Sequence, residues 1–252
     1  MNVLKEITDK KRDDLISLKS TISINDLMKN VCTKEKPQFF RKLESSKSKY
    51  KIIPETKKSS PSAGQIVKIY DPVENALSYI KSGFSVLSVL TEQHYFGGNI
   101  NDIGNIKSEV DVKILRKDFI VDEWQIYESK AFGADCILLI SESLSLDEIL
   151  DFSCIASDLN LDVLLEFHKE SELEKVLRSE LKLIGINNRN LETITTNINH
   201  CESLLNKYHK DLNPKKIIAE SGFSSKLELD QYVDIGVNKF LIGEGLLKNT
   251  LF

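Results

Sequence analysis

The chain has 252 residues, of which 41% are hydrophobic and 29% are charged, a composition typical of a globular protein. The formal net charge of -4 comes from interspersed acidic and basic residues, so there is no basic face of the kind that binds nucleic acid. No stretch approaches the roughly 20 apolar residues of a membrane span, and the first residues lack an apolar leader segment. We therefore expect a cytoplasmic protein that acts on small molecules, without a nucleic-acid partner or a membrane contact.

Residues 1–49 are predicted to form a helical extension packed on the rest of the molecule. Leu4 to Leu18 is amphipathic and rich in charge, and Gln38 to Glu44 has the length of a short second helix. Three roles are open for this extension: a cap on the bottom of a barrel, an oligomer contact, or a cover over the top of a site.

From residue 50 to residue 252, short apolar runs alternate with amphipathic segments, as strands alternate with helices in a parallel sheet. Eight strands are predicted, at 50–56, 85–91, 112–117, 135–141, 162–168, 182–187, 216–221 and 239–243. Helices are predicted between them, for example at 72–82, 122–132, 145–159, 171–179 and 224–233. The apolar runs are continuous, which indicates strands covered on both faces.

These units predict one structural domain over residues 50–252, an α/β fold of the (β/α)8 TIM-barrel type. A closed barrel is favoured over an open doubly wound sheet, because eight units of roughly 25 to 30 residues follow one another. The first strand also lacks the Gly-x-Gly-x-x-Gly turn of dinucleotide-binding folds. The eighth helix must be a stub, because only Leu-Leu-Lys-Asn-Thr-Leu-Phe follows Gly245.

The cysteines and histidines show no pattern of a metal or redox site. The four cysteines are far apart, form no Cys-x-x-Cys pair and have no metal-ligand spacing with the four histidines. We therefore expect reduced thiols and no bound metal. No cofactor motif occurs in the sequence, so no cofactor is predicted.

Polar residues stand at the ends of several predicted strands, where the catalytic groups of such barrels lie. Glu55 and Lys57 are two residues apart, which places them on one face of the first strand, and Glu166 ends the fifth strand and can face them across the barrel mouth. Glutamates and lysines held together can supply both an acid and a base near neutral pH. A single pair would be a structural salt bridge, but polar groups at five or more strand ends indicate an active site.

Glycines follow the last two predicted strands, in Ser221-Gly222 and in Gly243-Glu244-Gly245. Backbone N–H groups of these two turns form the phosphate site of many such barrels, and glycine lets the backbone approach the anion closely. The sequence therefore predicts a phosphate site at Ser221, Gly222, Gly243 and Glu244. The carboxylate of Glu244 must then point away from the anion.

Six segments together resemble the indole-3-glycerol-phosphate synthase family. They occur in the family's order and spacing from about Lys51 onward, and they are Glu55-x-Lys-Lys-x-Ser-Pro-Ser62, Ser88-Val-Leu-Thr-Glu-x-x-Tyr-Phe-x-Gly98, Leu115-Arg-Lys-Asp-Phe-Ile120, Gly133-Ala-Asp-x-Ile-Leu-Leu-Ile140, Ile184-Gly-Ile-Asn-Asn-Arg-Asn-Leu191 and Glu220-Ser-Gly222. The resemblance implies that 1-(2-carboxyphenylamino)-1-deoxyribulose 5-phosphate is converted to indole-3-glycerol phosphate, with loss of CO2 and water, in tryptophan biosynthesis.

The resemblance also implies roles for individual residues. Lys117 is the general acid, Glu166 the general base, and Lys57 a second acid or an electrostatic partner. Glu55 holds the lysines in place, and Asn187 contacts the hydroxyl or carboxylate region of the substrate. The implied substrate-binding residues are Ser60, Phe96 as an apolar wall for the anthranilate ring, Arg189 as support for Glu166 or the substrate carboxylate, Glu220 and Ser221.

Two alternatives are weighed against this function. Phosphoribosylanthranilate isomerase and the tryptophan synthase α-subunit share the phosphate site, but the isomerase requires a Cys at the end of the first strand, where this chain has Glu55 to Lys57. A catalytically silent barrel that binds a phosphate ligand or serves in an assembly is the other alternative, and the intact set of acid and base residues argues against it. A monomer is favoured as the oligomeric state.

Overall fold

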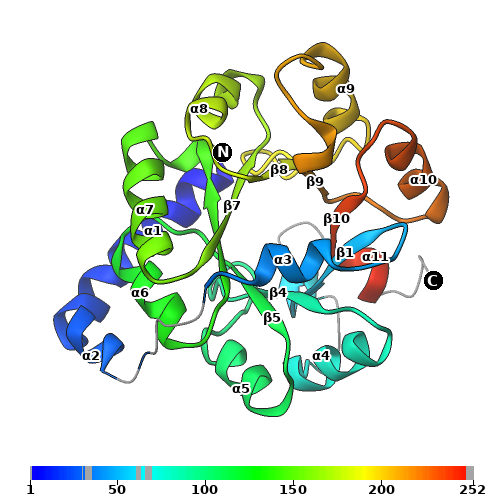
Figure 1. Cartoon of the computed structure of the whole chain (residues 1–252). Helices are drawn as coiled ribbons and strands as arrows, with labels where there is room; N and C mark the ends of the chain where they lie inside the picture. The colour runs from blue at the N-terminus through cyan, green and yellow to red at the C-terminus, as the bar shows by residue number, and fades with distance from the viewer. Residues whose placement is uncertain (1, 30, 32–35, 61–63, 66–69, 248–252) are drawn as a thin grey trace.

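The computed structural model describes residues 2–29, 31, 36–60, 64–65 and 70–247. Eight parallel strands form a closed barrel in the order β1-β10-β9-β8-β7-β6-β5-β4, with helices around the outside (Figure 1). The predicted TIM barrel is confirmed, and each predicted strand agrees within one residue at both ends. The strands are β1 (Lys51–Thr56), β4 (Val86–Leu90), β5 (Lys113–Lys117), β6 (Cys136–Ile140), β7 (Asp162–Phe167), β8 (Leu183–Asn187), β9 (Ile217–Glu220) and β10 (Lys239–Ile242).

Several of the helices on the outside begin at polar residues that cap their first N–H groups. Ser145 and Glu148 form a reciprocal capping box at the start of α7, and Asp71 accepts hydrogen bonds from two N–H groups of α4. The predicted helices at 72–82, 122–132, 145–159, 171–179 and 224–233 are confirmed. The helices are α4 (Pro72–Lys81), α5 (Asn101–Glu109), α6 (Trp124–Ala131), α7 (Leu146–Asp158), α8 (Leu173–Arg178), α9 (His200–Lys207), α10 (Lys226–Asp234) and α11 (Glu244–Leu247).

Short elements complete the barrel. The described part of the eighth helix is the four-residue α11, in agreement with the predicted stub. Two-residue strands β2 (Ser59–Ser60) and β3 (Gly64–Gln65) pair antiparallel in the loop after β1, and three single turns of 3-10 helix are η1 (Ser141–Ser143), η2 (Glu170–Glu172) and η3 (Pro214–Lys216).

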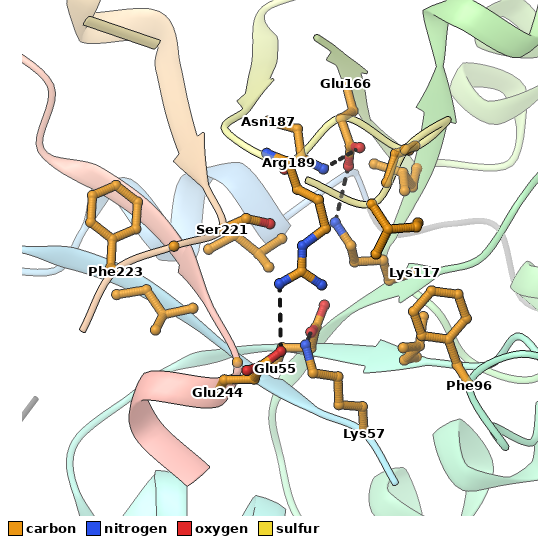
Figure 2. Close-up of a pocket in the computed structure, with 18 of the residues that line it drawn as sticks. Glu55, Lys57, Phe96, Lys117, Glu166, Asn187, Arg189, Ser221, Phe223 and Glu244 are labelled. Carbon is orange, nitrogen blue, oxygen red and sulfur yellow. Dashed lines mark hydrogen bonds and ion pairs between the residues drawn. The ribbon is translucent and has the colours of Figure 1, made fainter. Parts of the chain in front are cut away.

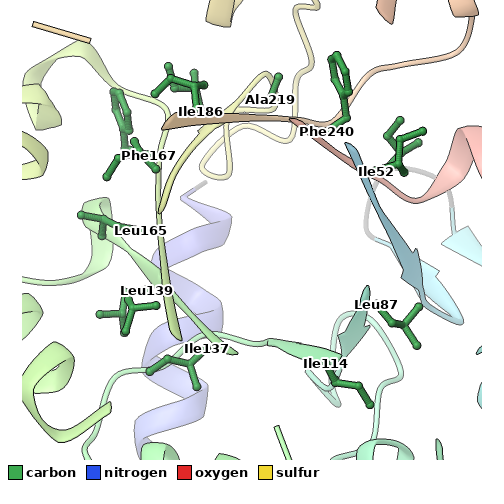
Figure 3. Close-up of a cluster of buried hydrophobic side chains, with 14 of the residues drawn as sticks. Ile52, Leu87, Ile114, Ile137, Leu139, Leu165, Phe167, Ile186, Ala219 and Phe240 are labelled. Carbon is green, nitrogen blue, oxygen red and sulfur yellow. The ribbon is translucent and has the colours of Figure 1, made fainter. Parts of the chain in front are cut away.

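Each strand buries both faces, which explains why the apolar runs are continuous. Figure 3 shows Ile52, Leu87 and Ile114 pointing outward from the strands, into the layer beneath the helices. Their neighbours Ile53 and Leu115 belong to a second buried cluster, inside the barrel. Because side chains alternate along a strand, the residue type at every second position decides what fills the barrel interior.

The N-terminal helices lie at opposite ends of the barrel; they are α1 (Val3–Thr21), α2 (Ile24–Met28) and α3 (Phe39–Glu44). Helix α3 crosses the bottom, where Phe39 and Leu43 are buried against the inner cluster (Figure 1). Glu44 binds Lys51 and, at 2.8 Å, Lys239, so α3 is tied to the first residues of β1 and β10.

Helix α1 instead contacts three loops at the top of the barrel. The N–H of Val3 donates to the carbonyl of Glu192 in the loop after β8, with an N···O distance of 3.1 Å. Lys11 pairs with Asp118 after β5 at 2.9 Å, and Asp14 lies 2.6 Å from a ring nitrogen of His94 after β4. Helix α1, which lies at the start of the sequence, therefore holds three of the loops that surround the barrel mouth.

The barrel is closed by its first and last strands. The register of β1 on β10 runs from Lys51 opposite Lys239 to Pro54 opposite Ile242, after which β1 pairs with β4 at Glu55 and Thr56. Pro54 has no N–H to donate, and it stands where β1 changes its partner strand.

Cys136, Cys154 and Cys201 carry free thiols, while Cys32 lies outside the described residues. No helix in the described part of the chain combines the length and the apolar character that crossing a membrane requires.

Candidate active site

A cavity of about 270 Å³ opens at the carboxyl ends of the strands (Figure 2). Most of the predicted site residues line it: Glu55, Lys57, Phe96, Lys117, Glu166, Asn187, Arg189, Ser221, Gly222, Gly243 and Glu244. Inward-pointing residues of the strands supply the chemistry, because the alternation that buries Ile53 and Leu115 inside the barrel also turns Glu55 and Lys117 inward, at the mouth. The side chain of Ser60 lies outside the described part of the structure.

Glu55 and Lys57 form a buried ion pair at the end of β1, with 2.7 Å between Nζ and Oε1. Burial opposes the ionisation of Glu55, but the charges of Lys57 and Lys117 outweigh it and lower the pKa of Glu55. A Cβ at Gly243 would lie 2.7 Å from Oε1 of Glu55 and 2.9 Å from Nζ of Lys57. The pair therefore requires glycine at the end of β10.

Lys117 ends β5, and its ammonium group lies between two carboxylates. Nζ is 3.0 Å from Oε2 of Glu166 on β7 and 2.7 Å from Oε2 of Glu220 on β9. Burial disfavours the charge of Lys117, but Glu166, Glu220 and Glu55 outweigh it and raise its pKa above the ordinary range. Lys117 is thus a proton-bearing cation at neutral pH, held at the cavity wall.

Glu166 has one oxygen on Lys117 and the other on an amide. The side-chain N–H of Asn187 donates to Oε1 of Glu166 at 2.7 Å, and Asn187 is itself held by the N–H of Arg189 on its Oδ1 at 2.9 Å. Burial would raise the pKa of Glu166, but Lys117 and Asn187 lower it. Glu166 is therefore an ionised carboxylate that can accept a proton.

Glu220 lies behind Lys117 and does not line the cavity. Its side chain is fully buried, and burial together with the neighbouring charge of Glu166 raises its pKa to about 8. Glu166 and Glu220 share the cation of Lys117, and the charge of Glu166 makes the ionisation of Glu220 less favourable. In the structure Glu220 contacts Lys117, and its contact with the substrate stays a prediction.

The raised pKa of Glu220 predicts a pH dependence of stability. The folded chain keeps a proton on Glu220 that the unfolded chain loses, so the contribution of this group is complete near pH 4 to 5 and is lost as the pH rises through about 8. We expect Glu220→Gln, which stays neutral, to gain stability relative to the wild type between about pH 5 and pH 8. Urea unfolding of both proteins across this range measures the difference, and parallel curves would contradict the assignment.

The side chain of Glu220 occupies the space beside Gly185 on β8, where any other residue would have a Cβ. A Cβ at Gly185 would lie 2.2 Å from Oε1 of Glu220, so we expect Gly185→Ala to lower the free energy of unfolding by about 1 to 3 kcal/mol. Gly104→Ala is the matched control, because Gly104 lies inside α5 and an added Cβ comes no closer than 4.0 Å to its nearest neighbour. That change is expected to stabilise the protein by up to about 1 kcal/mol. Denaturant unfolding of both variants tests the opposite signs.

Arg189 and Glu244 face each other across the cavity mouth. Nη2 of Arg189 is 3.5 Å from Oε1 of Glu244, and Nε donates to the hydroxyl of Thr196 at 3.1 Å. Glu244 lines the cavity with its carboxylate attracted to the guanidinium group, and the expectation that this carboxylate points away from a bound anion stays a prediction. Only the backbone of Glu244 remains a candidate for holding an anion.

The turn after β9 exposes backbone to the cavity in an unusual conformation. Ser221 and Gly222 both have positive φ, at +67° and +90°. Such a conformation costs a serine about 1 kcal/mol or more, and residues of this kind cluster at functional sites. A Cβ at Gly222 would also lie 3.0 Å from Thr196, so glycine is required there on two grounds.

Much of the remaining lining of the cavity is apolar, and it also includes Asp118 and Ser224. Phe96 was predicted, and its ring lies 6.1 Å from that of Phe119 between the ring centres. The apolar lining residues that were not predicted include Phe119, Leu138, Ile140 and Leu191. Phe119 follows Lys117 by two residues at a strand end, and this position was the available signal. In the part of the chain that the structure describes, no group of three or more His, Cys, Asp or Glu side chains could hold a metal ion.

Comparisons with known proteins show the family of the chain. The family model described as indole-3-glycerol phosphate synthase matches residues 4–251. Curated proteins of that name include one from Aliarcobacter butzleri that is 41% identical over 98% of this chain and 94% of its own length. Another, from Campylobacter jejuni subsp. doylei, is 38% identical over 98% of this chain and 95% of its own length.

Two solved structures share the barrel at 13% identity, a level that shows the fold alone. N-acetylmannosamine-6-phosphate 2-epimerase from Clostridium perfringens matches 77% of this chain and 86% of its own, with a TM-score of 0.57. Phosphoribosylanthranilate isomerase from Thermotoga maritima matches 77% of this chain and 87% of its own, with a TM-score of 0.55.

Proposed function

The chain belongs to the indole-3-glycerol phosphate synthase family of decarboxylating lyases, which act in tryptophan biosynthesis, and from this premise we propose how its residues close the indole ring. The observation that carries the proposal is the ammonium group of Lys117, held 3.0 Å and 2.7 Å from two carboxylates at the cavity wall. The family match argues against the two other barrels considered above, phosphoribosylanthranilate isomerase and the tryptophan synthase α-subunit. A catalytically silent barrel remains as the alternative that the assay must exclude.

In the first step, Lys117 acts as the general acid. The ring carbon that bears the carboxylate attacks the ketone carbon of the ribulose chain, and the ketone oxygen takes a proton from Lys117 Nζ. A cation placed where negative charge develops lowers the barrier to this attack. Glu166 and Glu220 support the step because they hold Nζ in place and keep it protonated.

The second step restores the aromatic ring. The bond between the ring and the carboxylate breaks, CO2 leaves, and the bonding electron pair returns to the ring. Arg189 is the residue we assign to the substrate carboxylate, because its planar guanidinium group lines the cavity and suits a carboxylate. Binding of the substrate would then compete with the contact between Arg189 and Glu244.

The third step is dehydration. The new hydroxyl group leaves as water with a proton from Lys57, and Glu166 takes the proton from the adjacent carbon of the chain. Asn187 supports this role because it fixes one oxygen of Glu166 at 2.7 Å, and Glu55 holds Lys57 at 2.7 Å. Two protons are donated and one is accepted, so one proton from solvent resets the site after CO2 has left.

Substrate binding divides between an apolar wall and a backbone turn. Phe96 and Phe119 form the wall for the anthranilate ring, which aromatic side chains cover well. N–H groups of Ser221, Gly222 and Gly243 are assigned to the phosphate, together with the N–H of Glu244. Ser60, in the loop after β1, is assigned to substrate binding. We further propose that the enzyme acts as a monomer in the cytoplasm.

The proposal is tested with the purified chain and 1-(2-carboxyphenylamino)-1-deoxyribulose 5-phosphate. We expect indole fluorescence to appear with release of one CO2 for each product molecule. A folded chain that binds this substrate without turning it over would support the silent barrel instead.

A further inference from the structure

Glu92 is a buried carboxylate outside the cavity, in the loop after β4. The residue is 1% exposed, and it is not among the residues that line the cavity. Oε1 accepts the N–H of His94 at 2.9 Å, and Oε2 accepts the N–H groups of Tyr95 at 2.7 Å and Phe96 at 3.0 Å. Hydrogen bonds to an ionised acceptor are stronger than neutral ones, and a buried charge needs such partners.

These three bonds set the path of the loop that carries Phe96. The backbone of Glu92 holds the other end of the same loop, because its carbonyl accepts the N–H of Gly98 at 2.7 Å. Gly98 is pressed against the preceding strand, and a Cβ there would lie 2.3 Å from the carbonyl oxygen of Leu90. The loop from Glu92 to Gly98 is therefore fixed at both ends by one residue.

The loop presents Phe96 to the cavity and also contacts the loop after β1. The Phe96 ring lies against Phe119, and its backbone carbonyl accepts the N–H of Ser59 at 3.3 Å. Ser59 is two residues after Lys57. A change at Glu92 is thus expected to reach the apolar wall and the chain that follows the catalytic lysine.

We propose that Glu92 is a positioning residue that sets Phe96 against the aromatic ring of the substrate. This inference rests on the proposed function of Phe96 as the wall of the anthranilate site. Glu92 acts through the backbone of the loop, not on the reacting atoms. Its loss should therefore weaken substrate binding and leave the acid–base chemistry of Lys117 and Glu166 largely intact.

The test compares Glu92→Gln, Phe96→Ala and the double variant in steady-state and single-turnover assays. Gln keeps the size of the side chain, but it replaces one of the two accepting oxygens with an NH2 group that cannot accept an N–H. We expect Glu92→Gln to raise KM about tenfold and to change kcat less than about threefold. Because Glu92 acts through Phe96, the double variant should have the KM of Phe96→Ala alone.

A matched control separates positioning from general stability. Glu148 also accepts a backbone N–H, that of Ser145 at 2.7 Å, but it caps α7 outside the cavity. Glu148→Gln should leave KM unchanged. Glu92→Asp, which keeps the charge on a shorter side chain, should restore part of the affinity and serves as the second variant if Glu92→Gln does not fold.

Each outcome distinguishes the two proposals. A rise in KM for Phe96→Ala with a wild-type KM for Glu92→Gln would overturn the role of Glu92 alone. The role of Glu92 would also be overturned if the effects of Glu92→Gln and Phe96→Ala on KM multiply in the double variant. It would be overturned as well if Glu92→Gln lowers kcat and leaves KM unchanged. A wild-type KM for Phe96→Ala would instead refute the proposed wall, and an inactive wild type would refute the proposed function.

Discussion

Replacement of Lys117 by alanine is expected to lower kcat about a thousandfold. The ketone oxygen would lose the cation that protonates it, and a positioned general acid contributes roughly 10² to 10⁴ in rate. Lys57 is not free to replace Lys117 as the general acid, because it is bound to Glu55 at 2.7 Å. The effect should appear in single-turnover rates, since these report the chemical steps without product release.

Lys113→Ala is the control for this variant. Lys113 stands at the opposite end of the same strand, 3.3 Å from Asp135, and does not line the cavity. Its loss should leave kcat within about twofold of the wild type. Because Lys117→Ala removes the cation between Glu166 and Glu220, Lys117→Met and an unfolding curve are needed to show that the fold persists. A folded variant with kcat within tenfold of the wild type would overturn the assignment of the acid.

Glu166→Gln is expected to lower kcat about a hundredfold or more, because the amide cannot accept the proton lost in the dehydration step. Its oxygen can still accept the N–H of Asn187, so the site should stay assembled. The pKa of Glu166 is lowered, so the base is ionised at neutral pH and wild-type activity falls only as the pH drops through that lowered pKa. The variant should lose this acidic limb of the kcat profile.

The pH profile distinguishes Glu166 from a merely supporting carboxylate. Glu174→Gln is the control, because Glu174 lies on α8 with its side chain 85% exposed, and this change should alter neither kcat nor the acidic limb. If Glu166→Gln keeps the acidic limb, another group is the base.

The barrel could be predicted from the sequence because both faces of every strand are buried. Continuous apolar runs mark such strands, and the polar residues that end them mark the mouth. For this reason Glu55, Lys117 and Glu166, which are far apart in the sequence, could be placed in one site from residue patterns alone. Convergence of strand ends is a property of the fold, so it requires no knowledge of individual contacts.

Contacts made by loops could not be predicted in the same way. Glu92 binds three backbone N–H groups, which depends on the path of the loop and leaves no pattern in residue types. The attraction of Glu244 to Arg189 joins two loops 55 residues apart, and the sequence offered only the general rule that an acid avoids a phosphate. Leu138 lies inside an apolar strand and could not be distinguished from a core residue.

The contacts of the N-terminal extension also could not be predicted from the sequence. Its helical character followed from the spacing of apolar residues, and α1 and α3 lie where the sequence predicted helices. Their places at opposite ends of the barrel depend on contacts such as those of Lys11 with Asp118 and of Glu44 with Lys239. Ion pairs between distant residues cannot be read from periodicity.

The pairing of β1 with β10 means that a growing chain cannot close its barrel until residue 242 has left the ribosome. Glu55 stands on the first strand and Gly243 follows the last, so the two sides of the catalytic centre meet only then. We expect chains that end before Lys239 to lack both turnover and cooperative unfolding. Until closure, β1 is an open edge on which other nascent chains could pair, and Pro54 removes one donor from that edge. A proline inside a closed barrel would thus protect the chain during its synthesis, which aggregation of Pro54→Ala in cell-free translation would reveal.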